Sequence, residues 1–400
     1  MLSGGGGGLR ELPEQDADLA LTALTETFAC LAAGGDDAAA YFYGWLFTTN
    51  PELRDLFPPA MDTQRDRFFV ALTTIVQGMT RSAEMAAYVA QLGVDHRKYL
   101  VRPAMYPPVG NALIATLRAF AGPAFTPQAE RAWMSAFESV ARLMINAAEE
   151  ASARTPAYWT AQVVAHEKRS HRIAVLTVET SQPLPYQAGQ HVTVQTERWP
   201  RVWRSYSVAC RPREDGLLRF HVKAVPGGWV STALVDHTRV GDTIVVGPAA
   251  GSMSLGLASK RDLICVAGGT GLAPLKAIAE EVAFAEAAAR SRRHVLLFCG
   301  ARREAELYDM KDLWQLAESY PWLRVYPVIS ADRGYRGMRG DVGQVAARYL
   351  PNAECEAYVA GPAAMVRHTI TVLTKVGQPI ERIHFDDALL APPPTGASGT

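Results

Sequence analysis

The chain of 400 residues is too long for one ordinary hydrophobic core, so we expect two or three domains. Forty lysines and arginines balance forty aspartates and glutamates, which gives no electrostatic case for a nucleic-acid partner or an anionic membrane. Hydrophobic residues make up 48% and charged residues 20%, as in globular proteins, and no apolar run reaches the roughly 20 residues that span a bilayer.

The two ends of the chain differ in composition from the rest. Residues 1–15 carry a run of glycines and lack the basic head and apolar core of a signal peptide, so we expect a disordered leader. Residues 391–400 are rich in Pro, Gly, Ser and Thr, and we expect a disordered tail. The five cysteines are scattered and form no Cys-x-x-Cys pair, which argues against a disulfide framework or zinc site and favours the reducing cytoplasm.

Residues 16–151 are expected to form an all-helical domain. Apolar residues recur at spacings of three and four, and Gly, Pro, Asn or Asp stand at the breaks between these runs. No alternating strand pattern interrupts them. The expected helices are 17–34, 38–50, 64–79, 83–94, 109–122 and 128–152.

Alternation of β-branched residues begins after residue 152, where a short linker leads into a domain expected at 155–258. Several short strands separated by Gly, Pro and Asp turns are typical of an antiparallel β-barrel. We expect its helix to begin near Val230 and the barrel to close near Gly247. The expected strands are 161–170, 171–180, 191–197, 203–210, 217–225 and 242–249.

From residue 261 the order changes to strand followed by helix, which predicts an α/β domain with a parallel sheet over 261–390. Its expected strands are 263–266, 294–302, 324–330 and 355–362, and its expected helices are 275–290, 307–320, 342–350 and 363–377. The predicted fold is therefore multidomain: all-α, then an antiparallel barrel, then a parallel-sheet α/β domain.

Two motifs in the expected barrel suit a flavin. In Arg-x-Tyr-Ser at a strand end, the guanidinium can pair with a phosphate of FAD, the Tyr ring can lie against the isoalloxazine, and the Ser can reach its N5 edge. In the following Gly-Gly-Trp-Val-Ser-Thr, glycines let the backbone approach a pyrophosphate, and the Ser and Thr stand where a helix would start and offer N–H groups to it. The candidate FAD-binding residues are Arg204, Ser205, Tyr206, Ser207, Gly227, Gly228, Val230, Ser231 and Thr232.

A third glycine-rich run lies between the first strand and the first helix of the α/β domain. Its glycines permit close approach to a pyrophosphate, which would meet the helix N-terminus, and a proline suits the first helical turn. The run ends in Pro in place of the third Gly of the dinucleotide fingerprint, so Gly-x-Gly-x-x-Gly enzymes match poorly. A tight turn without a ligand is the alternative. The candidate residues are Gly268, Gly269, Thr270, Gly271 and Pro274.

The second strand of this domain ends at Arg302 and Arg303, where a ribose or a 2′-phosphate would lie. Two arginines at this place favour NADPH, which carries the 2′-phosphate. Surface arginines near a helix start are common, however, so the choice between NADH and NADPH stays open.

Taken together, the motifs RSYS, GGWVS, GGTGLAP, FCGAR and AGP resemble those of the ferredoxin–NADP reductase superfamily over about residues 155–388. That family places an FAD barrel before an NAD(P) domain, in the order expected here. The resemblance adds Gly361 and Pro362 to the candidate nucleotide residues.

Residues 1–150 contain one histidine, His96. A lone histidine on a helix is usually a capped or surface residue. Three features favour haem ligation by this histidine: the domain is all-helical, it has the size of a globin, and an aromatic-rich stretch precedes the histidine. Those aromatics also suit an ordinary core.

The runs YFYGWLFTTNPELRDLFP and DHRKYLVRPAMYPPVG are similar to the globin domain of flavohaemoglobins, and this resemblance covers nearly the whole chain. It implies haem b, FAD and NAD(P)H as cofactors, with His96 as the axial ligand of the haem iron. Tyr106 and Glu150 match a tyrosine and a glutamate that hydrogen-bond this histidine on the proximal side. Glu149 is the alternative to Glu150 because it stands beside it in the same helix.

On the distal side, the resemblance implies roles for four residues. Tyr43 matches the tyrosine whose hydroxyl stabilises bound dioxygen, and Gln64 matches the distal glutamine. Phe57 would pack on the porphyrin, and Phe68 would line the distal pocket.

The chain departs from the flavohaemoglobin pattern at several positions. Asp95 precedes the axial histidine where the family usually has a lysine, and His191, a candidate flavin contact, stands where many relatives have tyrosine. Ala360 replaces the cysteine of Cys-Gly-Pro, and Ala388 replaces a terminal aromatic that lies against the flavin. The last two departures bear on hydride transfer from the nicotinamide.

The function implied by the resemblance is nitric oxide dioxygenase: electrons pass from NAD(P)H through FAD to haem iron, so that haem-bound O2 converts nitric oxide to nitrate. The implied partners are these small molecules, with no nucleic acid and no membrane span, and we expect a monomer or weak oligomer in the cytoplasm. One alternative is a related oxidoreductase fed by another donor, such as D-lactate, through FAD. The others are a non-catalytic globin that stores or senses oxygen, and a reductase whose helical domain holds no haem.

Overall fold

The computed structural model describes residues 14–78, 82–256, 259–289, 293–350 and 354–386. The chain divides into two compact units, Met1–Ala157 and Tyr158–Thr400, which we call the helical unit and the two-sheet unit. The expected tail at 391–400 lies outside the described residues, as do Ala388 and residues 1–13 of the expected leader.

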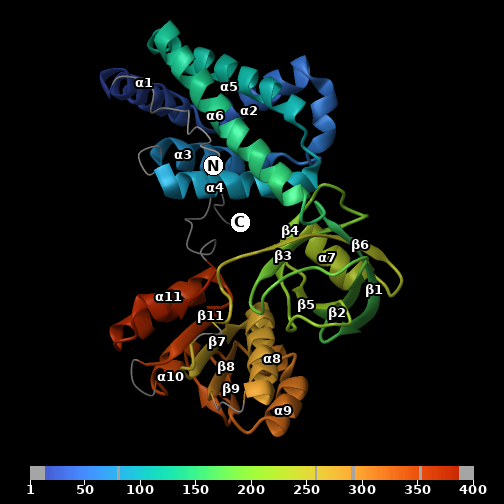
Figure 1. The fold of residues 1–400 in the computed structure, drawn as a ribbon. Coiled ribbons are helices and arrows are strands. Elements are labelled where there is room, and N and C mark those ends of the chain that lie inside the picture. The colour runs from blue at the N-terminus through green and yellow to red at the C-terminus, as the bar shows by residue number, and fades with distance from the viewer. Residues whose placement is uncertain (1–13, 79–81, 257–258, 290–292, 351–353, 387–400) are drawn as a thin grey trace. The chain divides into compact units, whose positions relative to one another are not determined.

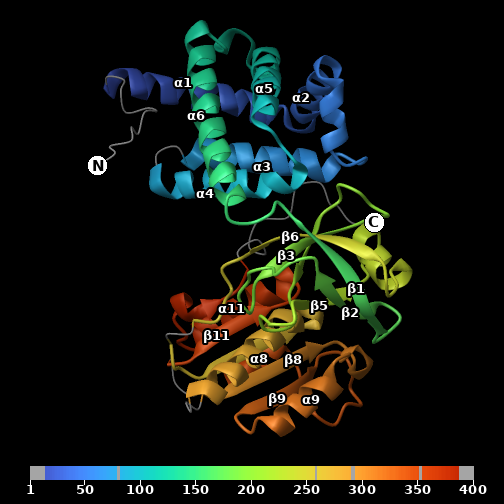
Figure 2. The same ribbon diagram turned by 45° about the vertical axis from the view of Figure 1, so that its right-hand side comes forward.

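The described residues of the helical unit form helices and turns and no strand, as the sequence predicted. The first helix begins two residues before the expected domain start at 16, within the predicted leader. The helices are α1 (Glu14–Ala33), α2 (Gly35–Thr49), α3 (Asp62–Gly78), α4 (Ser82–His96), α5 (Tyr106–Ala121) and α6 (Pro127–Ser152). In both Figure 1 and Figure 2, α3 and α4 run side by side.

The core of the helical unit forms where α4 and α1 pack on α6 and α2 packs on α5. Buried Trp133 of α6 donates its indole N–H to Thr27 of α1 at 2.8 Å, so the polar atom inside this core is satisfied. The start of α6 is fixed by the Thr126 hydroxyl, which accepts the N–H of Ala129 at 3.2 Å. This packing holds α4, whose last residue is His96.

The first sheet of the two-sheet unit is antiparallel, in the order β4-β3-β6-β1-β2-β5. A bridge between Val208 and Phe220, and a 2.7 Å hydrogen bond from Ala209 N–H to Arg219 O, join the chain after β4 to β5 and nearly close the barrel. Helix α7 (Trp229–Thr232) begins next to Val230, where the sequence predicted it. The strands are β1 (Trp159–Lys168), β2 (Ile173–Thr180), β3 (His191–Thr196), β4 (Arg204–Ser207), β5 (Leu217–Lys223) and β6 (Thr243–Ala250).

The second sheet is parallel, in the order β10-β9-β8-β7-β11-β12. Its strands are β7 (Leu263–Gly268), β8 (Val295–Ala301), β9 (Leu323–Ile329), β10 (Met338–Arg339), β11 (Glu356–Ala360) and β12 (Ile383–His384). Figure 1 shows α8 (Leu272–Ala289) and α9 (Met310–Ser319) on one face, and α10 (Val342–Ala347) and α11 (Ala363–Lys375) on the other.

The fold class predicted from the sequence is confirmed: all-α, antiparallel barrel, parallel-sheet α/β. Two strands were not expected, β10 and β12, because two residues are too few to leave an alternating pattern. Within the described part of the chain, no helix combines the length and apolar character that a membrane crossing requires.

Candidate functional site

The imidazole of His96 lies at the end of α4 and is bonded within its own helix. Its Nδ1 lies 2.6 Å from the carbonyl oxygen of Leu92, one turn earlier, so Nδ1 carries the proton and donates it. Burial lowers the pKa of the ring, which keeps it neutral. Among the described residues, Nε2 has no hydrogen-bond partner, and its lone pair is left for a metal. The residue therefore fits an axial haem ligand.

The other proximal candidates lie apart from this hydrogen bond. Half-buried Tyr106 begins α5, and burial raises its pKa, whereas Glu149 and Glu150 are exposed at the end of α6. No hydrogen bond joins either Tyr106 or Glu150 to His96 among the described residues, and the Leu92 carbonyl takes the ring proton instead. Their proximal roles stay a prediction.

The distal candidates come together in one aromatic cluster. The Tyr43 hydroxyl of α2 donates to the backbone carbonyl of Gln64 in α3 at 3.4 Å. The Tyr43 ring lies edge-on to Phe57 and Phe68, with centroids 5.6 and 5.9 Å away. Burial raises the pKa of Tyr43, so its hydroxyl stays protonated and can donate a hydrogen bond. This arrangement suits a small oxygen-containing ligand beside Tyr43.

Strand β4 carries the first flavin motif in antiparallel register with β3. Alternation places Arg204 and Tyr206 on one face of the strand and Ser205 and Ser207 on the other. Arg204 is exposed, while Tyr206 packs against the barrel core and burial raises its pKa. Ser207 pairs in register with His191, so these two candidates are brought together.

The second flavin motif forms a turn pinned by its own serine. Gly227 adopts a φ of 70°, a conformation that glycine takes readily. The Ser231 hydroxyl donates to the Gly228 carbonyl at 3.1 Å and accepts the Val225 N–H at 3.3 Å. Because α7 begins at Trp229, the Thr232 N–H lies one turn into the helix and donates to the Gly228 carbonyl at 2.9 Å. This N–H is therefore not available to an anion, contrary to the prediction for Thr232, whereas the first N–H groups of a helix have no partner within it.

The candidate nucleotide loop follows β7, where the order of the strands in the parallel sheet reverses. The chain builds β8 to β10 on one side of β7 and then returns to place β11 on the other, which is the position where open α/β sheets bind ligands. Here Gly271 approaches the backbone of Ala360, because a Cβ at Gly271 would lie 2.3 Å from its carbonyl oxygen. The sequence-distant Gly268 and Gly361 also meet, since a Cβ at Gly361 would lie 3.0 Å from the Gly268 Cα.

The remaining nucleotide candidates lie around this edge. Gly269 and Thr270 form the turn after β7, and Pro274 is buried in the first turn of α8. Pro362 precedes α11 directly. Arg302 follows β8 with an exposed side chain, and its backbone N–H donates to a carboxylate oxygen of Glu306 at 3.3 Å.

Comparisons with known protein families agree with this geometry. Residues 40–144 match the family model described as globin, residues 160–254 match the oxidoreductase FAD-binding domain, and residues 265–370 match the oxidoreductase NAD-binding domain. The flavohemoprotein of Deinococcus radiodurans is 28% identical over 92% of this chain and 95% of its own length. The electron transfer component XylA of xylene/toluene monooxygenase from Pseudomonas putida is 33% identical over 58% of this chain and 67% of its own length.

The fold of the whole chain also has a solved counterpart. The flavohemoglobin of Malassezia yamatoensis, a structure with bound FAD and heme, covers 92% of this chain and 98% of its own, with a TM-score of 0.74 and 18% identity. The chain belongs to the flavohaemoglobin family. It is an oxidoreductase whose cofactors are haem, FAD and a nicotinamide dinucleotide.

A buried ion cluster in this flavohaemoglobin was missed by sequence reasoning. Lys276 of α8 lies 2.6 Å from Asp309, just before α9, and both side chains are almost fully buried. Asp312 of α9 in turn accepts from Arg169, which follows β1, at 3.0 Å. The cluster ties the barrel to the parallel-sheet domain. The lysine within the mostly apolar run LKAIAEEVAF could have indicated a buried charge. Its partners could not be predicted, because they depend on the tertiary fold.

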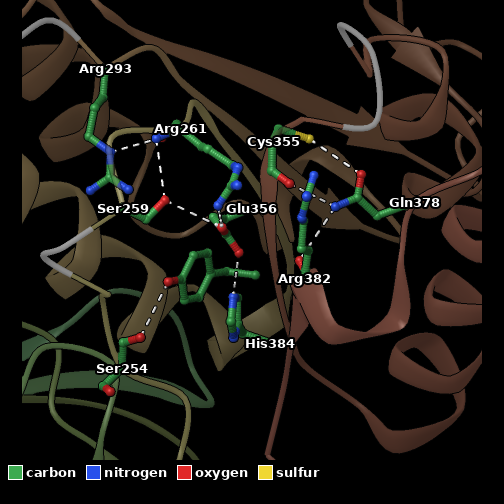
Figure 3. A network of polar contacts seen from close by, with 10 residues as sticks. Ser254, Ser259, Arg261, Arg293, Cys355, Glu356, Gln378, Arg382 and His384 are labelled. Carbon is green, nitrogen blue, oxygen red and sulfur yellow. Dashed lines mark hydrogen bonds and ion pairs between the residues drawn. The ribbon is translucent and has the colours of Figure 1, made fainter.

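A second network holds the last described strand, as Figure 3 shows. The Glu356 carboxylate at the start of β11 lies 2.8 Å from His384 Nε2 and 3.1 Å from Arg261. Burial alone would raise the pKa of Glu356, but these two partners lower it below its usual value. The Tyr358 ring stacks on His384 at 4.6 Å, and its hydroxyl donates to the Ser254 carbonyl at 3.3 Å. The network fixes β12 on β11.

The chain that leaves β12 reaches the flavin motif. Asp386 lies 3.3 Å from His191 Nδ1, and His191 pairs with Ser207 on the next strand. A Cβ on Gly251 would lie 2.9 Å from the same Nδ1, so glycine leaves room for the ring. Sequence reasoning selected His191 but not its acidic partner.

Proposed function

We propose that this flavohaemoglobin is a nitric oxide dioxygenase that draws electrons from NAD(P)H. When bound, FAD accepts a hydride and passes on single electrons, and haem iron binds O2. The protein's part is to hold these groups and to donate hydrogen bonds where charge develops.

The observation that carries the proposal is the protonated Tyr43 hydroxyl in the same helical unit as a neutral His96. A hydroxyl that donates to Gln64 over a long 3.4 Å can turn to a better acceptor, such as a bound oxygen atom. Because burial keeps Tyr43 protonated, the donor persists at physiological pH. Phe57 and Phe68 lie edge-on to the Tyr43 ring, and the burial of Tyr43 limits the access of bulk water.

The two-sheet unit supplies the reducing side of this proposal. Tyr206 would lie against the isoalloxazine, Ser207 would reach its N5 edge, and Arg204 would pair with a phosphate. Gly271 lets the loop pack closely on the Ala360 backbone, and the glycine-rich loop held there would meet a pyrophosphate with its backbone N–H groups.

The test is an anaerobic absorbance titration of the purified full chain with NADH, NADPH and D-lactate in turn, followed by nitrate analysis after O2 and nitric oxide are added. We expect a nicotinamide to bleach the flavin, reduce the haem and support nitrate formation. Tyr43→Phe should lower nitrate formation about tenfold, since a hydrogen bond to a charged acceptor contributes roughly 1.5–3 kcal/mol. Tyr41→Phe, on the exposed face of the same helix, is the matched control. A flavin that neither nicotinamide reduces would contradict the proposal.

A second candidate function is oxidation of a 2-hydroxy acid such as D-lactate through FAD. The 3.3 Å contact between His191 Nδ1 and the Asp386 carboxylate supports it, because a carboxylate that accepts from Nδ1 orients the ring so that Nε2 can act as the base that such a reaction needs beside the flavin. His191 would accept the proton of the substrate hydroxyl, and bound FAD would supply the two-electron oxidation that turns the 2-hydroxy acid into a 2-oxo acid. Ala360, in place of the family's cysteine, removes a thiol near the nicotinamide.

The same titration separates the two candidates. Flavin bleached by D-lactate but not by NADH or NADPH would replace the dioxygenase proposal with the second one. In that case His191→Gln should slow flavin bleaching about a hundredfold or more, as expected for loss of a general base, while FAD stays bound. A rate unchanged by the substitution would exclude His191 as the base.

We also propose the cytoplasm as the working compartment. All five cysteines are unpaired thiols, and four of them are buried. Unpaired thiols persist in a reducing environment, which supports this location.

A further inference from the structure

Two tryptophans from different loops of the barrel stack on each other. Trp199 belongs to the segment between β3 and β4, and Trp229 opens α7 directly after the two glycines of the second flavin motif. Their ring centroids are 4.7 Å apart, with 22° between the planes. Trp229 stays 39% exposed, which is unusual for so large an apolar side chain and leaves part of a flat aromatic surface open to a ligand.

The loop that carries Trp199 is held in place. The Trp199 N–H donates to the Thr196 carbonyl at 3.1 Å, and the Trp199 carbonyl accepts from Val202 at 3.3 Å. Arg201 adopts a left-handed φ of 66°, and its N–H donates to the Gln195 side chain at 2.6 Å. A non-glycine residue rarely takes this conformation, so the surrounding contacts determine the turn.

The loop that carries Trp229 is held as well. The Gly228 N–H donates to the Val225 carbonyl at 2.9 Å, and the Ser231 hydroxyl bonds both residues. Because both loops are fixed, the stacked pair is pre-organised and a ligand would lose little free energy in ordering it.

The position of the pair matches one end of FAD. Along β4 the flavin contacts, Tyr206 and Ser207, lie at one end and the phosphate partner, Arg204, lies at the other. Trp199 precedes Arg204 in the chain and so lies beyond the end of β4 that carries the phosphate partner. Trp229 directly follows the two glycines of the second flavin motif. In FAD the adenosine lies on the far side of the pyrophosphate from the isoalloxazine, so it would reach this end of the site.

We propose that Trp199 and Trp229 form a stacking platform for the adenine ring of FAD and make the barrel select FAD over FMN. Every purine has a flat π face, and an aromatic side chain stacks on it without a need for matched hydrogen bonds. The proposal rests on the FAD assignment of the barrel and is independent of the nitric oxide activity.

The test measures dissociation constants of FAD and FMN with the full chain after FAD is removed and haem is retained. FMN carries the isoalloxazine and a phosphate but no adenine. We expect Trp229→Ala to weaken FAD about tenfold or more, to leave FMN affinity unchanged, and to remove part of the tryptophan quenching that FAD causes. Trp229→Phe keeps a ring and should retain most of the FAD affinity.

Trp314→Ala is the matched control, because Trp314 is an exposed tryptophan on α9, outside the barrel. It should leave both affinities unchanged. Unchanged FAD affinity in Trp229→Ala, or an equal loss of FAD and FMN affinity, would overturn the platform. An unmodified chain that binds neither flavin would overturn the FAD assignment itself.

Discussion

The candidate haem site of this flavohaemoglobin is built from side chains, whereas its candidate nucleotide site is built from backbone. In the helical unit, the candidate haem contacts are side chains: the imidazole at the end of α4 and the aromatic cluster around Tyr43. His96, for example, is bonded within its own helix, to Leu92. In the parallel-sheet domain, the candidate nucleotide surface is backbone, where Gly271 meets Ala360 and Gly361 meets Gly268.

This difference has a physical consequence for substitutions. The imidazole of His96 is bonded only to its own helix, so its removal should leave the fold intact, and the expected loss is the cofactor. At the nucleotide loop an added atom collides with another backbone segment, so the expected loss includes stability. Cofactor absorbance should therefore respond to a substitution at His96, and the unfolding free energy should respond to one at the nucleotide loop.

The largest expected effect is that of His96→Ala, which should abolish haem binding. Its Nε2 is the lone pair we assign to iron, and no other histidine lies in residues 1–150. The Soret band should disappear while FAD absorbance and the circular dichroism of the helices persist. Arg204→Ala is the converse control: it should weaken FAD binding and leave the Soret band unchanged. Haem retained by His96→Ala would refute the ligand assignment.

Gly271→Ala should show the opposite pattern, with reduced stability as well as weaker nucleotide binding. The new Cβ would lie 2.3 Å from the Ala360 carbonyl oxygen and 2.5 Å from the Gly361 nitrogen, so the turn after β7 would have to move away from the end of β11. Overpacking of this kind costs about 1–3 kcal/mol of unfolding free energy, measurable by denaturant titration of the two-sheet unit. NADPH and NADH titrations should weaken in parallel.

Gly256→Ala serves as the control for this substitution, since a Cβ there meets nothing within 4 Å. Its unfolding free energy and its nucleotide affinity should match those of the unmodified chain. A Gly271→Ala variant with the same unfolding free energy as the control would show that the loop can yield, and would remove the basis of the comparison.

The sequence predicts the local features of this molecule better than the contacts between segments that are distant in the chain. Glycine motifs and helical periodicity are local, so they predicted the loop at Gly268–Gly271, the helix near Val230 and the order of the domains. Contacts between distant segments leave no local pattern. The pairing of Lys276 with Asp309 needed the fold, as did the stack of Trp199 on Trp229.

The smallest expected effect concerns His221 of β5, next to the buried ion cluster. Its Nδ1 lies 2.8 Å from the Tyr308 hydroxyl, and burial, reinforced by positive Lys276, places its pKa well below the usual 6.5. As pH falls below about 6.5, the unfolded chain takes up a proton that the folded chain refuses, so stability is lost on acidification. A full unit of pH below that point corresponds to at most about 1.4 kcal/mol.

His221→Gln removes this proton uptake, while an amide can still bond the Tyr308 hydroxyl. Between pH 7.5 and 5.5, its unfolding free energy should therefore fall by about 1 kcal/mol less than that of the unmodified chain, by urea titration of the two-sheet unit. Equal slopes in His221→Gln and the unmodified chain would mean that His221 is protonated in the folded state, beside Lys276. The cluster would then have to accommodate a further positive charge, which the burial of Lys276 and Asp309 argues against.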